Sequence, residues 1–313
     1  MLSSTAECLY WLGRYMERAG NNARGLQVTL RMSSLTGAVD RRDNAWRALL
    51  TASGCAPGFA ETGAAMTQAN VVRYLAADAT NGSSILSCIE AARSNARRVR
   101  TALTTDMWEA VNETWSEGRR TTEATFTPDN LPAFLDWVKQ RTILFNGAYA
   151  DTMLRDEAWS FVRLGTMFER ADNTARVLDV HHHALAGAEE GGALAYVQWQ
   201  AILRSVSALR AYQWVYHSRL DPERIAELLI LRPELPRSMI ACYARIEETL
   251  DGIAALHGGR RGECHRLAGE MHARLRFGRV EDIMSGGLHE FLTAMVNRNL
   301  ELGRQIQEFY LQA

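Results

Sequence analysis

Two short clusters of charged and polar residues have the types and the spacing to do chemistry. Each consists of a Glu-Arg pair, an asparagine four residues after the glutamate and an arginine seven residues after it. The members are Glu17, Arg18, Asn21 and Arg24, and, 152 residues further along, Glu169, Arg170, Asn173 and Arg176. Carboxylates can accept protons, and guanidinium groups bind carboxylates and phosphates through paired hydrogen bonds. The clusters are therefore candidates for acid–base chemistry, anion binding or ion pairing.

Both clusters lie on predicted helices that repeat one another. Residues 12–26 and 164–178 are identical at nine of fifteen positions. Each helix has an apolar stripe opposite its polar face, formed by Leu12, Met16, Ala19, Ala23 and Leu26, and by Leu164, Phe168, Ala171, Ala175 and Leu178. Apolar residues also flank the polar faces, namely Tyr10 and Val28, and Val162 and Val180. This pattern predicts helices that are buried on both sides.

Burial of the polar faces would require partners, because an isolated buried charge costs several kcal/mol. Reciprocal ion pairs between the two helices would supply them. The candidate pairs join Glu17 with Arg170 or Arg176, and Glu169 with Arg18 or Arg24. A second interpretation is a polar slot between two halves of the protein, where up to four guanidinium groups receive a carboxylate or phosphate ligand. A third is a solvated face without energetic importance.

A second basic feature lies on another predicted helix. Arg93, Arg97 and Arg100 line one side of it. They form a candidate anion patch for phosphate, nucleic acid or an acidic partner, and the alternative is a solvated face. The net charge of the chain is −1, so it produces no long-range field that would favour nucleic acid.

The sequence lacks the usual signatures of metal, cofactor and membrane binding. No CxxC pair and no Glu-x-x-His occurs, so we expect no metal site. A phosphate-binding loop and a dinucleotide fingerprint are also missing, so we expect no cofactor. Residues 1–30 hold no apolar leader, and no run of about 18 apolar residues occurs. We therefore expect a cytoplasmic protein without membrane contact, with free thiols at its five cysteines.

Helical signals dominate the whole chain. Helices are predicted at 4–35, 40–53, 67–78, 84–104, 106–120, 129–152, 156–185, 193–217, 221–231, from Pro236 to about 256, and in the remainder. No segment alternates like a strand. The fold class is therefore all-α, a single large bundle of about eleven helices over residues 1–313. The duplicated segment predicts an internal pseudo-two-fold repeat, with halves at about 1–127 and 128–313.

Several stretches together resemble the bacterial Alpha-E family, an all-helical domain named for its Glu-Arg motif. They are the Glu-Arg-Ala segments of both halves and residues 95–100, 107–112 and 235–238. The family motif corresponds to Glu17, Arg18, Glu169 and Arg170. The resemblance implies association with circularly permuted ATP-grasp ligases, transglutaminase-like peptidases and proteasome-like hydrolases, a system that makes and breaks amide bonds in peptides.

Three functions follow as hypotheses. The first is a non-catalytic interaction subunit that docks an ATP-grasp-type ligase or positions its peptide substrate. The second is an enzyme of amide-bond metabolism, with Glu17 or Glu169 as the general base and the arginines as an anion clamp. The third is a phosphate or nucleic-acid binder that uses the candidate anion patch.

Overall fold

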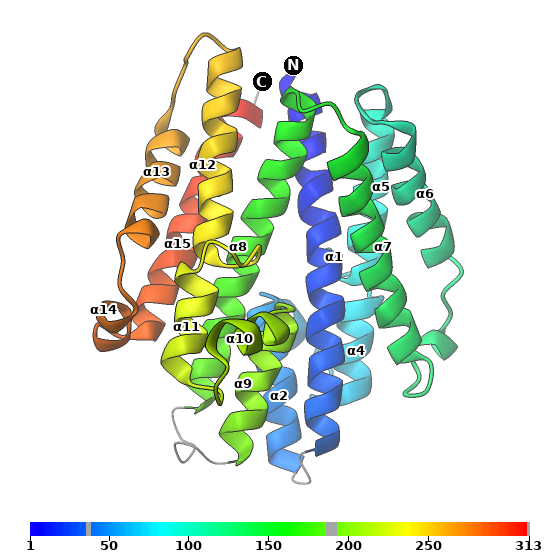
Figure 1. Ribbon diagram of the computed structural model, residues 1–313. Coiled ribbons are helices and arrows are strands. Elements are labelled where there is room, and N and C mark those ends of the chain that lie inside the picture. The colour runs from blue at the N-terminus through cyan, green and yellow to red at the C-terminus, as the bar shows by residue number, and fades with distance from the viewer. Residues whose placement is uncertain (36–38, 186–192, 312–313) are drawn as a thin grey trace.

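The computed structural model describes residues 1–35, 39–185 and 193–311, and it confirms the all-α class. Over these ranges it contains fifteen α-helices and no strand (Figure 1). They are α1 (Ser3–Leu35), α2 (Val39–Ala52), α3 (Ala56–Glu61), α4 (Gln68–Ala76), α5 (Ile85–Arg98), α6 (Thr105–Gly118), α7 (Leu131–Thr152), α8 (Glu157–Leu185), α9 (Ala193–Ser205), α10 (Leu209–Tyr216), α11 (Pro222–Leu231), α12 (Met239–Leu256), α13 (Glu263–Arg276), α14 (Val280–Ser285) and α15 (Leu288–Ile306).

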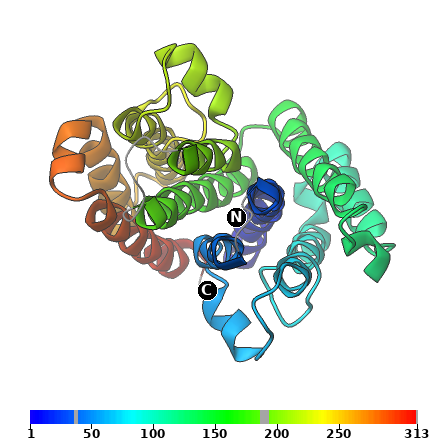
Figure 2. The ribbon, with the colours of Figure 1, turned by 90° about the horizontal axis from the view of Figure 1, so that it is seen from below.

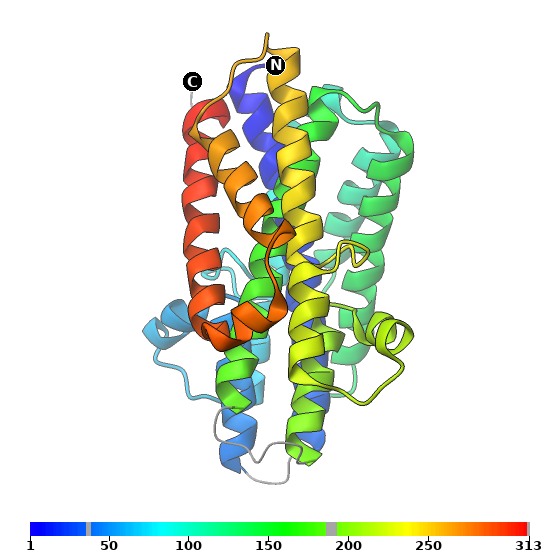
Figure 3. The same ribbon diagram turned by 60° about the vertical axis from the view of Figure 1, so that its left-hand side comes forward.

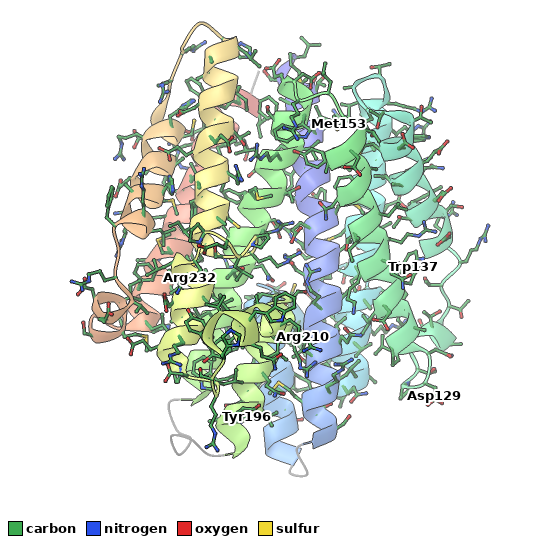
Figure 4. The ribbon with its side chains drawn as sticks, in the orientation of Figure 1. Asp129, Trp137, Met153, Tyr196, Arg210 and Arg232 are labelled. Carbon is green, nitrogen blue, oxygen red and sulfur yellow. The ribbon has the colours of Figure 1, made fainter. Side chains whose placement is uncertain are left out.

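The two longest helices, α1 and α8, lie side by side and form the axis of the molecule (Figure 1). They run in the same direction, and both begin at the end where the N-terminus lies. Met153, in the turn before α8, is at this same end (Figure 4). The terminal ammonium of Met1 lies 2.9 Å from Oε2 of Glu157, which ties the starts of the two helices together.

The helix that follows each of the two central helices also packs against the other central helix. α2 packs against α8 as well as α1, and α9 packs against α1 as well as α8. In the view from below, α2 and α9 lie beside the central pair of α1 and α8 (Figure 2). The centre of the fold is thus built from segments that are far apart in the sequence.

Shorter helices cover the two sides of this centre. On one side α5 and α7 pack against α1, and α6 packs against both of them. On the other side α12 and α15 pack against α8, with α13 between them (Figures 1 and 3). Every residue of the two predicted apolar stripes is buried, with at most 2 % of its surface exposed. All residues of both stripes belong to the hydrophobic core.

α1 and α8 approach most closely at two glycines. A Cβ atom added to Gly13 would lie 2.3 Å from the carbonyl oxygen of Val162, and one added to Gly165 would lie 2.0 Å from that of Tyr10. Both distances are well inside van der Waals contact. Only glycine allows the two backbones to be this close. The contact is also reciprocal, since each glycine faces the residue three positions before the other glycine.

The expected number of about eleven helices is too low. The predicted helix 193–217 breaks into α9 and α10 around Ser207, whose φ of 57° is left-handed and cannot continue a helix. The loop predicted at 54–58 contains the start of α3, and the stretch after residue 258 divides into α13, α14 and α15. The helix expected to reach residue 104 ends at Arg98 and is followed by a 3₁₀ turn, Arg100–Ala102.

Two further predictions are tested directly. No helix among the described residues is both long and apolar enough to cross a membrane. All five cysteines are buried free thiols, as expected: Cys8, Cys55, Cys88, Cys242 and Cys264.

Candidate functional site

The carboxylate of Glu169 lies in the contact between α1 and α8. It is held entirely by arginines of the other helix. Nε of Arg18 donates to Oε1 at 2.5 Å, and Nη2 of Arg18 donates to Oε2 at 2.9 Å. Nε of Arg14 donates to Oε2 at 2.9 Å. Glu169 is only 7 % exposed, so these charge-assisted bonds replace the water that its carboxylate loses on folding. We call Glu169, Arg14 and Arg18 the Glu169 cluster.

The carboxylate of Glu17 lies on the opposite side of the same contact. Nη2 of Arg170 donates to Oε2 at 2.9 Å, and Nη1 of Arg237 donates to Oε1 at 2.6 Å. Nη2 of Arg24 lies 3.5 Å from Oε1. Three guanidinium groups, from α8, from the loop before α12 and from α1 itself, thus surround one carboxylate with 3 % exposure. We call Glu17, Arg24, Arg170 and Arg237 the Glu17 cluster.

The loops before α5 and α12 are held beside these clusters by equivalent bonds. Nδ2 of Asn22 donates to the carbonyl oxygen of Ser83 at 2.7 Å, and Oγ1 of Thr174 donates to that of Arg237 at 2.9 Å. Ser84 and Ser238 then cap the helices that follow. The position of the Arg237 backbone is therefore set by α8, which brings its guanidinium to Glu17.

The two clusters keep their carboxylates charged. Burial alone would raise the pKa of Glu169, but Arg18 and Arg14 outweigh this effect and lower it to about 2. Burial has the same effect on Glu17, where Arg170, Arg237 and Arg24 hold the pKa far below its ordinary range. Both groups are thus ionised at neutral pH and are weak proton acceptors.

The structure brings together some of the predicted residues and separates others. The predicted cross pairs Glu17 with Arg170 and Glu169 with Arg18 are present. Arg176 does not reach Glu17, because its Nε donates to Oδ2 of Asp172 on the same helix at 2.7 Å. Arg24 does not reach Glu169. No hydrogen bond of the Asn173 side chain is found within residues 1–35, 39–185 and 193–311.

Sequence reasoning missed two arginines of the site. Arg14 lies one turn before Arg18, but the repeat has Thr166 at the corresponding position, so the duplication gave no signal. Arg237 precedes α12 and is 220 residues from its partner Glu17. In the sequence, its segment contributes only to the family resemblance. The serine cap at Ser238 marks the start of a helix, but it does not indicate which face of the protein that loop reaches.

The candidate anion patch is divided between α5 and the 3₁₀ turn that follows it. Arg93 and Arg100 lie against indole rings of α6: the Arg93 guanidinium carbon is 4.2 Å from the ring centroid of Trp115, and that of Arg100 is 4.9 Å from Trp108. Arg97 is exposed. The prediction that all three arginines share one side of a helix is wrong. Because α5 ends at Arg98, Arg100 does not continue the helical row that contains Arg93 and Arg97. The arginines are thus partly engaged with aromatic side chains.

Two other kinds of chemistry find no support in this part of the molecule. No group of three or more His, Cys, Asp or Glu side chains that could hold a metal ion occurs among the described residues. Cys88 interacts electrostatically with Arg18, and Cys242 with Arg170. Burial raises the pKa of each to about 12, so neither is a thiolate nucleophile at neutral pH.

Comparison with known families gives a match over residues 1–311 to Alpha-E, described as a predicted alpha-helical domain with a conserved ER motif. The chain belongs to the Alpha-E family. The Alpha-E chain is also similar to uncharacterized proteins of Mycobacterium bovis and Mycobacterium tuberculosis, at 23 % identity over 316 residues. The match covers 92 % of this chain and 34 % of the relatives, so this chain spans about a third of their length. No solved structure matches it.

The Glu-Arg dipeptide occurs three times in this Alpha-E chain, at 17–18, 169–170 and 223–224. Glu223 and Arg224 are exposed at the start of α11. The other two dipeptides lie face to face, and each supplies a glutamate to the arginine of the other. In this Alpha-E domain, the paired dipeptides therefore join α1 to α8.

Proposed function

We propose that this Alpha-E chain is a non-catalytic helical subunit that acts with an ATP-grasp-type amide ligase, with a transglutaminase-like peptidase as a second partner. One observation carries the proposal. Both Glu-Arg glutamates are buried in ion pairs that tie α1 to α8, so the most distinctive residues of the chain are used to build a scaffold. The identity of the partners comes from the family resemblance.

The same observation disfavours the enzyme hypothesis. A general base needs a pKa near the working pH and a path to its substrate. The pKa of Glu169 is about 2, and that of Glu17 is held lower than its ordinary range by three guanidinium groups. Each carboxylate is more than nine-tenths buried. A base with these properties would remain paired rather than accept a proton.

The lengths of the relatives give further support. In the mycobacterial proteins, the region similar to this chain makes up 34 % of the sequence. The Alpha-E region is therefore joined to other sequence in those proteins. A helical region that occurs beside other segments fits a role as a partner or positioning module.

We also propose that the scaffold arose by duplication of a seven-helix unit. The buried positions of α4 and α11 have the same pattern at a spacing of 154 residues: Val71, Val72, Tyr74, Leu75 and Ala76, and Ile225, Ala226, Leu228, Leu229 and Ile230. The order of helices supports units α1–α7 and α8–α15, with α14 as an addition. The boundary would then lie between Thr152 and Glu157, rather than near residue 127.

A candidate docking surface for the ligase lies on α9 and α10. Trp214 and Val215 are adjacent on α10 and are 71 % and 43 % exposed, and Tyr196 on α9 is 48 % exposed. Tyr196 and Arg210 mark this part of the molecule in Figure 4. Tryptophan is rarely so exposed on a surface without a partner, and it is enriched at protein interfaces.

Co-purification tests the proposal. The tagged chain is expressed in its native host, captured at low salt and compared with the double variant Trp214→Ser, Val215→Ser. We expect an ATP-dependent ligase of the ATP-grasp type to accompany the parent chain in near-equal amount, and to be lost with the double variant. Phe277→Ser is the matched control, since Phe277 is 78 % exposed elsewhere.

Two outcomes would count against these ideas. Absence of any ligase from the parent sample would reject the proposed function. Equal recovery with the double variant and with Phe277→Ser would retain the function and reject the α10 surface.

A further inference from the structure

The Glu17 cluster contains more positive than negative charge. Arg24, Arg170 and Arg237 all lie within 3.5 Å of the Glu17 carboxylate, and all three side chains are at most 15 % exposed. Arginine stays protonated in proteins, so the cluster has an excess of two positive charges. Burial and the neighbouring Arg237 lower the pKa of Arg24 to about 9, which still leaves it charged at neutral pH. Such an excess is costly in a buried site.

Two hydrogen-bond donors, one in this cluster and one on the neighbouring Asn21, have no partner among the residues that the structure describes. They are Nε of Arg24 and Nδ2 of Asn21, and both atoms are buried. Oδ1 of Asn21 accepts from Nη2 of Arg24 at 2.5 Å and from Nη1 of Arg237 at 3.4 Å. These two donors fix the orientation of the amide, so exchanging its nitrogen and oxygen would not supply the missing bond. A buried donor without an acceptor costs about 1–3 kcal/mol.

We propose that the Glu17 cluster is a binding site for a divalent oxyanion, such as a phosphate group. The anion would accept from Nε of Arg24 and Nδ2 of Asn21, and it would neutralise the excess charge. A phosphate group has a charge of about −1.5 to −2 at pH 7, which matches the excess of the cluster. A carboxylate has only one negative charge and would compensate half of it.

The site lies where the two sides of the fold meet. An added Cβ on Gly20 of α1 would lie 3.4 Å from Nη1 of Arg24 and 3.0 Å from Oγ1 of Thr142 on α7. Arg237 approaches from the loop before α12, and its side chain is 15 % exposed. An anion at this site would contact α1 and the α12 loop, and the partly exposed Arg237 side chain lies between the site and solvent.

The Glu169 cluster has an excess of only one positive charge and no unpartnered donor among the described residues, and it is the internal reference. Two guanidinium groups face its carboxylate, and Nε of both Arg14 and Arg18 donates to Glu169. No side-chain donor of these three residues is without a partner in the described structure. The residue that corresponds to Arg24 is Arg176, which is paired with Asp172. The proposal thus concerns one side of the α1–α8 contact only, and it is independent of the proposed partner ligase.

The test is a titration of the purified full chain with inorganic phosphate at constant ionic strength, followed by calorimetry and by the melting temperature. We expect saturable binding to the parent chain, and acetate at least tenfold weaker. Arg24→Met should weaken phosphate binding at least tenfold, because it removes one charge-assisted donor group worth about 1.5–3 kcal/mol. Arg176→Met is the matched control and should bind as the parent does.

A second measurement keeps the test decisive if Arg24→Met does not fold. In the parent chain labelled with ¹⁵N-arginine, the Nε–Hε resonance of Arg24 should shift with phosphate, and that of Arg14 should not. Absence of saturable binding, or an equal response of Arg24→Met and Arg176→Met, would overturn the proposal. Equal affinity for acetate and phosphate would overturn the assignment to a divalent anion.

Discussion

The two Glu-Arg clusters share a dipeptide and a place in the α1–α8 contact, but they differ in what surrounds them. Glu169 is held by two arginines, both from α1. Glu17 is held by three, which come from three different elements. The dipeptide itself gives the same cross pair in each cluster. The flanking residues create the difference, since Arg14 corresponds to Thr166 and Arg237 to Ser83.

This difference separates two uses of one motif. In the Glu169 cluster every charged donor is satisfied, so the cluster is complete as a structural joint. The Glu17 cluster includes the same joint together with added positive charge and unpartnered donors. A duplicated element can thus keep its structural role in one copy while the other copy gains binding groups.

The largest expected effect comes from separating α1 and α8, which should break both clusters together. Gly165→Ala places a Cβ 2.0 Å from the carbonyl oxygen of Tyr10, and Gly13→Ala places one 2.3 Å from that of Val162. Because both obstacles are backbone atoms, the helices must move apart. We expect each variant to lose more than about 3 kcal/mol of unfolding free energy, or not to fold. Urea denaturation measures this loss.

Gly252→Ala is the control for this prediction. Gly252 lies within α12, and an added Cβ there would meet no atom within 4 Å. We expect this variant to be more stable by about 0.5–1 kcal/mol, because alanine favours the helix. A similar cost for Gly252→Ala and Gly165→Ala would show that close approach is not the cause.

Neutralising each glutamate should distinguish the clusters from one another. Glu17→Gln leaves three guanidinium groups around a neutral amide, whereas Glu169→Gln leaves two. Removing one partner of a buried pair costs about 3–5 kcal/mol. We expect Glu17→Gln at the upper end of this range and Glu169→Gln at the lower end, measured by urea denaturation. A greater loss for Glu169→Gln would contradict the charge difference described above.

The dependence of stability on pH should show a smaller effect, which comes from the ionised carboxylate of Glu169. The pKa of Glu169 is about 2 in the folded chain, below the ordinary value of 4.5 for a glutamate. The unfolded chain therefore binds a proton first as pH falls, and the stabilisation is lost between about pH 5 and 2. The loss is at most about 3 kcal/mol. In Glu169→Gln this contribution should be absent. The unfolding free energy, measured by urea denaturation at several pH values between 5 and 2.5, should therefore fall less steeply with pH than that of the parent.

The smallest effect is expected at Arg176, the repeat counterpart of Arg24. Arg176 and Asp172 form a partly exposed pair one helical turn apart. Pairs of this kind contribute about 0.3–0.5 kcal/mol. Arg176→Gln should therefore change the unfolding free energy by no more than about 0.5 kcal/mol. A loss above about 1.5 kcal/mol would mean that Arg176 has a structural role like those of Arg14 and Arg18.

Local sequence patterns predicted much of this fold. The apolar stripes are buried, and Ser84 and Asp221 cap α5 and α11 through their side chains. These features depend on residues within one or two helical turns, so a single sequence contains them. The cross pairs Glu17–Arg170 and Glu169–Arg18 were predicted because duplication supplied the long-range relation.

Features that depend on tertiary packing were not predicted. Arg237 reaches Glu17 because α8 binds the loop before α12, and no local pattern encodes that contact. The helix breaks at Ser207, although no glycine or proline lies nearby to predict a break. The α1–α8 glycine contact was not predicted either: Gly13 and Gly165 are identical positions of the repeat, but identity alone does not show that two backbones meet there.

The packing of α8 against α1 has a consequence for synthesis of the chain on the ribosome. α1 leaves the ribosome first. The segments that cover its polar face, which are α8 and the loop before α12, follow about 150–220 residues later. At about 5–20 residues per second this delay is roughly 8–45 s. During it, Glu17 and Arg18 remain hydrated, and Leu12 and Met16 lack the α8 residues of their core cluster. The late arrival of α8 therefore sets when Leu12 and Met16 are buried and when Glu17 and Arg18 meet their partners, and nascent chains ending before residue 185 are the ones in which we expect chaperone binding.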